Sequence, residues 1–392
     1  MGVDADWRLR TVVGVPREAD PDEARVALAP TVIPQLTRSG LEIIVERGAG
    51  VSAGFADDLY ESHGARLGSR EEVLGADIVV RVRGWGVDDA SPRVLHPDQV
   101  VIGMADPVGS PLAVRAAADD KLTAIALDLM PRITRAQAMD ALSSQATVTG
   151  YRAVLLAADR LPKMFPMLTT AAGTVPPAQV LVVGAGVAGL QAIATARRLG
   201  AVVQAYDVRP AAQEDIESLG ARSVLLPLAP GDAEDASGYA KELGDAFYRR
   251  QQNLLAQVAA GMDVIVTTAL IPGSPAPVLI TADAVAGMQP GSVIVDCAAE
   301  RGGNCELTRP DETVLAANGV TILGPTNLPS TVPGDASLMY AKNVAAFLGL
   351  ITSDGRIVLD ERDEIVRETL VTRGGEIVNG RVLHALEESR DV

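Results

Sequence analysis

The stretch VLVVGAGVAGLQA (residues 180–192) decides the fold, because an apolar strand runs directly into G-x-G-x-x-G and then into a helix. The first glycine, Gly184, is typical of a tight turn. Gly186 lets backbone amides approach a pyrophosphate, and Gly189 lets the helix pack closely on the strand. The helix begins with unpaired N–H groups and the positive end of its dipole, both of which favour a bound anion. The pattern predicts a dinucleotide-binding βα turn.

The next strand, AVVQAYD (201–207), ends in Asp207, which lies 18 residues after Gly189. A carboxylate at this position accepts bonds from the ribose hydroxyls of NAD and repels the additional phosphate of NADP. Arg209 is evidence for NADP instead, since an arginine can bind a 2′-phosphate, although it can equally lie over the adenine. The alternative is a glycine-rich turn that binds no ligand. The combined pattern favours NAD.

Strands and helices alternate on both sides of this motif. Before it, strands are expected at 11–16, 41–50, 74–84, 98–104 and 123–129, helices at 31–40 and 111–121, and a long helix at 146–161. After it, strands are expected at 262–270, 291–298 and 319–327, a helix at 335–352, and a hairpin with a Gly-Gly turn at 368–382. Such alternation is typical of a doubly wound parallel sheet.

A chain of 392 residues is too long for one ordinary core. We predict an α/β fold with two Rossmann-like doubly wound parallel-sheet domains separated by a cleft. The first is discontinuous, has no glycine fingerprint, and comprises residues 1–142 and 335–392, because a hairpin alone is only marginally stable. The second, residues 143–334, binds NAD(H).

Composition excludes several classes of function. The net charge of −16 argues against binding to nucleic acid or to an anionic membrane surface. Cys297 and Cys305 lack metal-ligand spacing, so no metal site is predicted; a disulfide is conceivable, but two isolated thiols favour a reducing cytoplasm. The longest apolar run, residues 180–190, is far shorter than the ~20 residues of a membrane span. The start, MGVDADWRLR, does not look like a signal peptide, and the chain is expected to be soluble.

A second polar stretch, PRITRAQAMDALSSQA (131–146), has a different character, because it contains no histidine, cysteine or lysine. Gln137, Asp140 and Ser143 recur at i, i+3, so a helical turn would present them on one face. These side chains and Arg132 can grip a polar ligand but are not proton shuttles at neutral pH. The alternative is a capped surface helix with solvated polar residues.

Long stretches of the chain resemble the alanine dehydrogenase and transhydrogenase superfamily, along nearly its whole length. They are GVPREADPDEARVALAP (14–30), GAGVAGLQAIATARRLGA (184–201), TTALIPGSPAPVLIT (267–281) and DCAAERGGNC (296–305). Within that superfamily, PRITRAQAMDALSSQA and SGYAKELGDAF (237–247) look like the peripheral NAD(H)-binding alpha component of proton-translocating NAD(P)⁺ transhydrogenase.

The resemblance implies a set of cofactor contacts. The segment 131–146 is implied to form a loop over the nicotinamide and its ribose, in which Gln137 and Asp140 position the nicotinamide and no residue is a covalent catalyst. Tyr239 is implied to lie on a mobile lid over the nucleotide; the alternative is a solvated tyrosine on a flexible loop. Leu270 is implied to contact the cofactor; the alternative is that it is an ordinary core residue. The implied contacts are Arg132, Ile133, Thr134, Gln137, Ala138, Met139, Asp140, Ser143, Gly184, Ala185, Gly186, Val187, Gly189, Asp207, Val208, Arg209, Gly238, Tyr239, Gln251 and Leu270.

The same resemblance implies an activity and partners. The chain would pass a hydride from NADH to NADP⁺ held on another subunit, coupled to proton translocation. Direct transfer between two nicotinamides needs close placement more than a general base. A homodimer is implied, with an NADP(H)-binding subunit and membrane-embedded subunits that hold the chain at the cytoplasmic face of the membrane.

Alanine dehydrogenase is the main alternative, since the resemblance gives it the same fold and cofactor. That enzyme uses an arginine, a lysine and a histidine of its first domain. Here the arginine is kept as Arg25, but the lysine position is Arg83, which cannot lose its proton. No histidine follows the matching strand, and His96 precedes it. Arg25 is therefore expected in a structural ion pair or a domain clamp. A third class is a non-catalytic NAD(H) sensor.

Overall fold

The computed structural model describes residues 10–85, 95–227, 244–271 and 274–388. Its contacts group the chain into two units, which we describe separately. Unit 1 comprises Met1–Gln145 and Pro329–Val392, and unit 2 comprises Ala146–Leu328. The expected boundaries, 142/143 and 334/335, differ from this grouping by a few residues. At the first of them, helix α5 (Ala141–Arg160) starts in unit 1 and runs on into unit 2.

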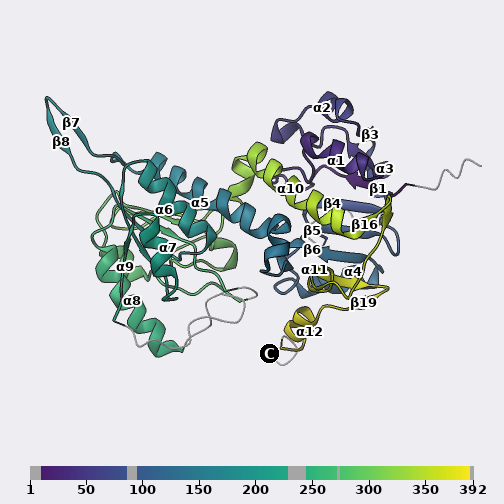
Figure 1. Ribbon diagram of the computed structural model, residues 1–392. Coiled ribbons are helices and arrows are strands. Elements are labelled where there is room, and N and C mark those ends of the chain that lie inside the picture. Colours follow the sequence, from purple (N-terminus) through teal and green to yellow (C-terminus); the bar gives the residue numbers. More distant parts are fainter. Residues whose placement is uncertain (1–9, 86–94, 228–243, 272–273, 389–392) are drawn as a thin grey trace, which may run out of the picture. The chain divides into compact units, whose positions relative to one another are not determined.

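Unit 1 contains an eight-stranded sheet with the order β19-β18-β6-β5-β4-β1-β2-β3 (Figure 1). Neighbouring strands from β1 to β6 are parallel, whereas β18 pairs antiparallel with β6. The strands are β1 (Val12–Val15), β2 (Glu42–Glu46), β3 (Arg66–Gly68), β4 (Ile78–Arg83), β5 (Val100–Met104), β6 (Thr123–Ala126), β18 (Leu370–Arg373) and β19 (Glu376–Ile377).

The C-terminal hairpin is confirmed. Thr372 pairs with Ile377 across Gly374 and Gly375, whose φ angles are +59° and +89°. Two consecutive residues with positive φ are what a type I′ turn requires, and glycine adopts that conformation without strain. The hairpin lies at the edge of the sheet that β1 to β6 build, so two stretches far apart in the sequence share one sheet.

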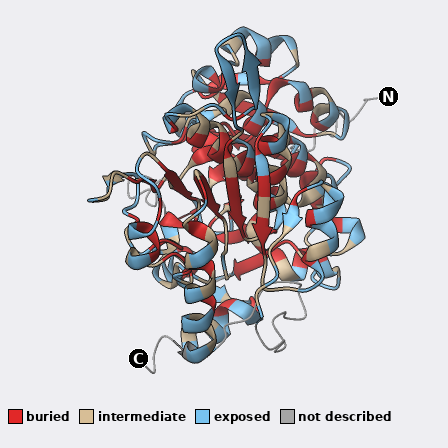
Figure 2. Cartoon of the chain, turned by 90° about the vertical axis from the view of Figure 1, so that its left-hand side faces the viewer, coloured by how far each residue is buried: buried red, intermediate tan, exposed pale blue. Residues whose placement is uncertain are grey.

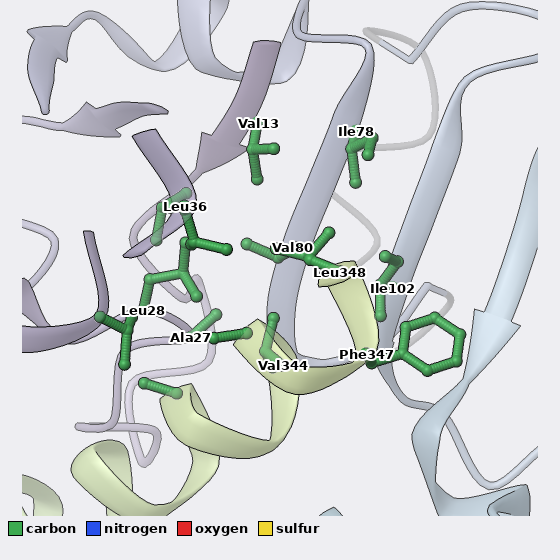
Figure 3. Packing of buried hydrophobic residues seen from close by; sticks show 14 of the residues in the cluster. Val13, Ala27, Leu28, Leu36, Ile78, Val80, Ile102, Val344, Phe347 and Leu348 are labelled. Carbon is green, nitrogen blue, oxygen red and sulfur yellow. The ribbon is translucent and has the colours of Figure 1, made fainter. Parts of the chain in front are cut away.

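Successive strand residues point to opposite sides of this sheet, and helices cover both faces. Helix α10 (Pro333–Ile351) covers one face, and Figure 3 shows its residues Val344, Phe347 and Leu348 against Val80 and Ile102. The opposite face packs against α4 (Pro111–Asp119) and α12 (Gly380–Glu388). The other α-helices of unit 1 are α1 (Ile33–Arg38), α2 (Asp57–Ser62), α3 (Arg70–Leu74) and α11 (Glu364–Thr369). A small hairpin joins β16 (Thr352–Ser353) to β17 (Arg356–Ile357).

Unit 2 contains a seven-stranded sheet with the order β11-β10-β9-β12-β13-β15-β14. All its strands pair in parallel except the edge strand β14. The order reverses at β9, which is the switch point where open α/β sheets bind ligands beyond the strand ends. The strands are β9 (Gln179–Val183), β10 (Val202–Tyr206), β11 (Arg222–Ser223), β12 (Val264–Thr267), β13 (Val293–Asp296), β14 (Thr313–Leu315) and β15 (Thr321–Leu323).

The two faces of this sheet are also covered. One face packs against α5, α6 (Val187–Arg198) and α7 (Ala212–Ser218), and the other against α8 (Asp245–Ala259) and α9 (Ala282–Ala286). Figure 2 shows the result, with buried strands and helices that expose their outer sides. The predicted fold class of two parallel-sheet α/β domains is confirmed.

A feature that the pattern analysis missed is a separate two-stranded hairpin in unit 2. It is formed by β7 (Leu168–Thr170) and β8 (Gly173–Val175), and all six of these residues are exposed. Cys297 and Cys305 are both free, so the disulfide is absent. Burial raises the pKa of Cys305 to about 11 and that of Cys297 further, so both thiols stay protonated at neutral pH. Over the described ranges, no helix has the length and apolar character to span a membrane.

Candidate functional site

The glycine-rich turn follows β9 directly. Gly184 has a φ of +96°, and a Cβ atom there would lie 2.8 Å from the Thr268 hydroxyl oxygen. The Thr268 hydroxyl donates to the Gly184 carbonyl at 3.0 Å, and the Gly184 amide donates to the Tyr206 carbonyl at 2.8 Å. The turn is therefore fixed by β10 and by the residue after β12, and only glycine fits its first position.

The other two glycines differ in what surrounds them. A Cβ atom on Gly189 would lie 1.8 Å from the Gly184 carbonyl oxygen, so α6 packs against the turn with no room for a side chain. A Cβ atom on Gly186 would meet no described heavy atom within 4 Å. Gly186 and Val187 are exposed where α6 begins, so their amides are available to an anion. Packing thus explains Gly189, whereas no contact among the described residues requires a glycine at position 186.

Asp207 and Arg209 form a bidentate ion pair beside this turn. The Arg209 side chain contacts the two Asp207 carboxylate oxygens at 2.9 and 3.0 Å, and its backbone amide donates to Oδ1 at 2.9 Å. The Ala185 amide donates to Asp207 Oδ2 at 2.7 Å. Asp207 therefore links the end of β10 to the glycine turn. Its two carboxylate oxygens accept from four donors, so a bound ribose hydroxyl would replace one of them. Arg209, the residue that argued for a 2′-phosphate, is held by this carboxylate.

Gln251 lies behind this region on α8 and is buried. Its Nε2 donates to the Tyr206 hydroxyl at 2.7 Å, whereas its Oε1 is buried without a hydrogen-bond partner among the described residues. Burial raises the pKa of Tyr206 to about 12, so this phenol remains protonated. Val208, between Asp207 and Arg209, is half-buried.

Leu270 follows β12 and is 44% exposed, so its interpretation as an ordinary core residue is wrong. The preceding residue, Ala269, is held on both sides by the buried Asn304. Asn304 Nδ2 donates to the Ala269 carbonyl at 2.8 Å, and its Oδ1 accepts from the Ala269 amide at 3.0 Å. The motif DCAAERGGNC contains Asn304, but its pattern alone did not indicate this role. An asparagine in a glycine-rich loop, which can bond backbone groups when it is buried, is the signal that indicates this role.

In unit 1, the segment 132–143 has a different shape from the expected one. Thr134–Met139 is a 3₁₀-helix (η4), Asp140 has ψ +85°, and α5 begins at Ala141. The Asp140 Oδ1 accepts from the Ser143 amide at 2.8 Å and so caps α5. The prediction that one helical turn carries Gln137, Asp140 and Ser143 is wrong, because this cap separates two helices. It also starts α5 five residues before the predicted position, 146.

The side chains of this segment divide into two groups. Arg132, Thr134, Gln137 and Ala138 are exposed, while Asp140 and Ser143 are half-buried. Ile133 and Met139 pack against the apolar core of unit 1 and so anchor the segment. The exposed and half-buried group remains accessible to a ligand.

Arg25 and Arg83 take part in ion pairs at the carboxyl ends of β1 and β4. Arg25 makes a bidentate contact to the buried Glu23, at 2.8 and 2.6 Å, and donates to Gln145 Oε1 at 2.8 Å. The expected structural ion pair of Arg25 is therefore confirmed. Arg83 lies 3.7 Å from Asp20 and 3.6 Å from Glu23. Both guanidinium groups are thus engaged by carboxylates of the chain itself.

Glu18 is a further buried acid at this edge. Its Oε1 accepts from the Val82 amide at 2.6 Å, and its Oε2 lies 3.9 Å from Arg81. Burial raises the pKa of Glu18 to about 7, against the opposing effect of Arg81. His96 is exposed before β5, as expected of a solvated loop residue.

The predicted site residues thus form two groups. The glycine turn, Asp207 and Arg209 are joined by hydrogen bonds within unit 2, and residues 132–143 form one connected segment within unit 1. Gly238 and Tyr239 lie outside the described residues.

Comparisons with known proteins cover most of the chain. The family model "Alanine dehydrogenase/PNT, N-terminal domain" matches residues 14–149, and "Alanine dehydrogenase/PNT, C-terminal domain" matches residues 153–380. A protein from Rhodospirillum rubrum, named as the first part of NAD(P) transhydrogenase subunit alpha, is 46% identical over 375 residues, which cover 94% of this chain and 97% of that protein.

A solved structure agrees with this match. The crystal structure of transhydrogenase from Sinorhizobium meliloti aligns with a TM-score of 0.84 and 43% identity, over 94% of this chain and 100% of that one. Alanine dehydrogenase from Bacillus subtilis is similar at a lower level, with 26% identity over 383 residues, or 93% of this chain and 92% of that protein.

Proposed function

Because the chain belongs to the alanine dehydrogenase/PNT family, we propose that it is the NAD(H)-binding subunit of a proton-translocating NAD(P)⁺ transhydrogenase. It passes a hydride from NADH to NADP⁺ on a partner subunit. One observation carries the cofactor assignment: Gly186 borders open space at the start of α6, while Asp207 closes the neighbouring strand. This combination suits a dinucleotide with free ribose hydroxyls.

Each group of residues then has a binding role. In unit 2, the amides of Gly186 and Val187 bind the pyrophosphate, and Asp207 accepts from the ribose. In unit 1, Gln137 and Asp140 orient the nicotinamide, which supplies the hydride when bound. The second carboxylate oxygen of Asp140 serves this purpose, since Oδ1 caps α5. Residues 131–146 include no histidine, cysteine or lysine, which suits a transfer that needs placement and no proton shuttle.

The rival activity, alanine dehydrogenation, finds little support in unit 1. A carboxylate substrate needs a cation that can bind it, but Arg25 and Arg83 contact Glu23 and Asp20. Arg83 also cannot give up its proton at neutral pH. Incubation of the purified chain with alanine and NAD⁺ tests this point: sustained NADH formation would overturn the proposal.

Two measurements test the proposed activity. Titration of the purified chain with NADH and then with NADPH is expected to show strong preference for NADH, since the Asp207 carboxylate repels a 2′-phosphate. Addition of the partner subunits is then expected to give NADH-to-NADP⁺ hydride transfer. Tight NADH binding without transfer in the complete complex would instead support a non-catalytic NAD(H) sensor.

The proposed partners include a second copy of the chain, the NADP(H)-binding subunit and membrane-embedded subunits, which hold the chain at the cytoplasmic face. The β7–β8 hairpin supports the homodimer, because an isolated hairpin is marginally stable unless it packs on something. Met167 beside it is 62% exposed. Met167→Glu is expected to give monomers in light scattering, whereas Leu112→Glu, at an 83% exposed position in α4, leaves the mass unchanged. A dimeric Met167→Glu variant would refute this role of the hairpin.

A further inference from the structure

The apolar stretch that ends helix α10, NVAAFLGLI (343–351), begins with a polar side chain, Asn343. Asn343 is 7% exposed and is followed by Val344 and Ala345, which belong to the core of unit 1. A buried amide without partners is costly, so its hydrogen bonds show what it is for.

Asn343 uses both ends of its amide on the segment that contains Gln137 and Asp140. Its Nδ2 donates to the Ala138 carbonyl at 2.9 Å, and its Oδ1 accepts from the Ser144 hydroxyl at 2.7 Å. A carbonyl only accepts hydrogen bonds, so the orientation of the amide is determined. Ala138 precedes Asp140 and Ser144 follows it, and one side chain therefore bridges the break between η4 and α5.

We propose that Asn343 is a positioning residue for hydride transfer, which holds Gln137 and Asp140 in the geometry that the nicotinamide requires. This inference rests on the proposed function. Gln137 is exposed, and the Asp140 carboxylate accepts from the amide of Ser143 in its own segment. Their placement therefore depends on the backbone that carries them, and Asn343 holds that backbone from the core side.

Further contacts support the segment on either side of this bridge. Gln145 Nε2 donates to the Ser144 hydroxyl at 3.2 Å and to the Ala336 carbonyl of α10 at 3.1 Å, and its Oε1 accepts from Arg25. At the outer side, Arg135 contacts both carboxylate oxygens of Asp363, at 2.7 and 2.8 Å. The segment is thus fixed at its ends, and the Asn343 bridge holds its middle together with the packing of Met139 on the core.

The decisive variant is Asn343→Asp, which keeps the shape but places a carboxylate oxygen against the Ala138 carbonyl. Misplacement of reacting groups by about 1 Å costs up to about 100-fold in rate, so we expect single-turnover hydride transfer in the complete complex to fall about 10- to 100-fold. The dissociation constant of NADH, measured on the chain alone, is expected to change less than about threefold, since the glycine turn of unit 2 is untouched.

Lowering the pH tests whether the lost hydrogen bond to the Ala138 carbonyl causes the slower transfer. The introduced carboxyl, once protonated, again donates to the Ala138 carbonyl. The transfer rate of Asn343→Asp relative to the wild type is therefore expected to recover as the pH falls. Ser144→Ala removes the second bond of the bridge together with the contacts of this hydroxyl to Gln145 and to the Ala141 carbonyl. It keeps the bond from Asn343 to Ala138 and is expected to slow transfer by a smaller factor, about threefold, without loss of the fold.

Asn379 provides the matched control. It is also buried in unit 1, and its Nδ2 donates to the Glu368 and Leu370 carbonyls at 2.8 and 3.2 Å, away from η4. Asn379→Asp is expected to lower the urea midpoint about as much as Asn343→Asp while transfer stays within about twofold of the wild type.

The outcomes separate this inference from the proposed function. Absence of transfer by the wild-type complex would refute the proposed function. Normal transfer by Asn343→Asp, or equal losses in the two aspartate variants, would overturn the positioning role alone. An increase in the NADH dissociation constant that matches the loss in rate would overturn it as well.

Discussion

A methyl group added at Gly186 is expected to affect the ligand and spare the fold. The φ and ψ angles of Gly186, −76° and −168°, are open to alanine, and the added carbon has free space around it. Gly→Ala at a compatible position gains about 0.4–1 kcal/mol through the unfolded chain, while alanine is a poorer N-cap than glycine by a similar amount. The free energy of unfolding of Gly186→Ala is therefore expected to stay within about 0.5 kcal/mol of the wild type.

NADH binding by this variant is expected to weaken strongly, because the methyl group occupies the approach of the pyrophosphate to the start of α6. Loss of one hydrogen bond to a charged group costs about 1.5–3 kcal/mol, which corresponds to a roughly 10- to 100-fold increase in the dissociation constant.

Gly189→Ala is the matched change with the opposite result. Its added carbon would lie 1.8 Å from the Gly184 carbonyl oxygen, so α6 must move away from the turn. Such overpacking costs about 1–3 kcal/mol and occasionally more, and a contact this short belongs at the upper end. Urea unfolding and calorimetric NADH titration of both variants measure the two effects. Wild-type NADH affinity in Gly186→Ala, or wild-type stability in Gly189→Ala, would refute the reasoning.

Three further changes test other regions of the chain. Burial raises the pKa of Glu18 from 4.5 to about 7, so the folded state binds this proton more tightly and the free energy of unfolding falls as the pH rises between these values. Glu18→Gln is expected to reduce that fall by on the order of 3 kcal/mol in urea titrations. An unchanged dependence of the free energy of unfolding on pH would contradict this. Asp207→Asn releases Arg209 and removes a negative charge, so the preference for NADH over NADPH is expected to fall about tenfold or more in titrations with both nucleotides. A wild-type ratio of the two dissociation constants would contradict this. Gln137→Asn is expected to slow hydride transfer far more than it weakens NADH binding, and equal losses would rule out positioning.

Features of the fold set by local patterns were predictable from the sequence. The glycine turn, the alternation of strands and helices, and the Gly374–Gly375 hairpin each depend on residues close together in the chain. The separate roles of Gly186 and Gly189 follow from the known geometry of this turn, and the space around each agrees with them. These features depend on backbone sterics, which the residue types report directly.

Other features of the candidate site depend on contacts that spacing does not reveal. The i, i+3 pattern predicted one helical turn, but the Asp140 carboxylate caps α5 and breaks that turn. From its position in the sequence Arg209 could bind a phosphate, but in the folded chain its side chain forms an ion pair with Asp207. Asn343 lies far along the chain from the segment it holds, with a separation of 205 from Ala138. Only the folded chain brings such partners together.

The division of unit 1 into two stretches has a consequence for biosynthesis. The ribosome releases strands β1 to β6 first, then the whole of unit 2, and only afterwards α10 and β18, which cover and extend the first sheet. At ~5–20 residues per second, the nascent sheet waits on the order of 10–40 s with one apolar face uncovered. Unit 2 is contiguous and has no such delay. We therefore expect chaperones to engage the N-terminal stretch during translation. Ribosome-bound chains halted while α10 is still inside the exit tunnel are expected to be cut in the N-terminal stretch by protease, while unit 2 resists.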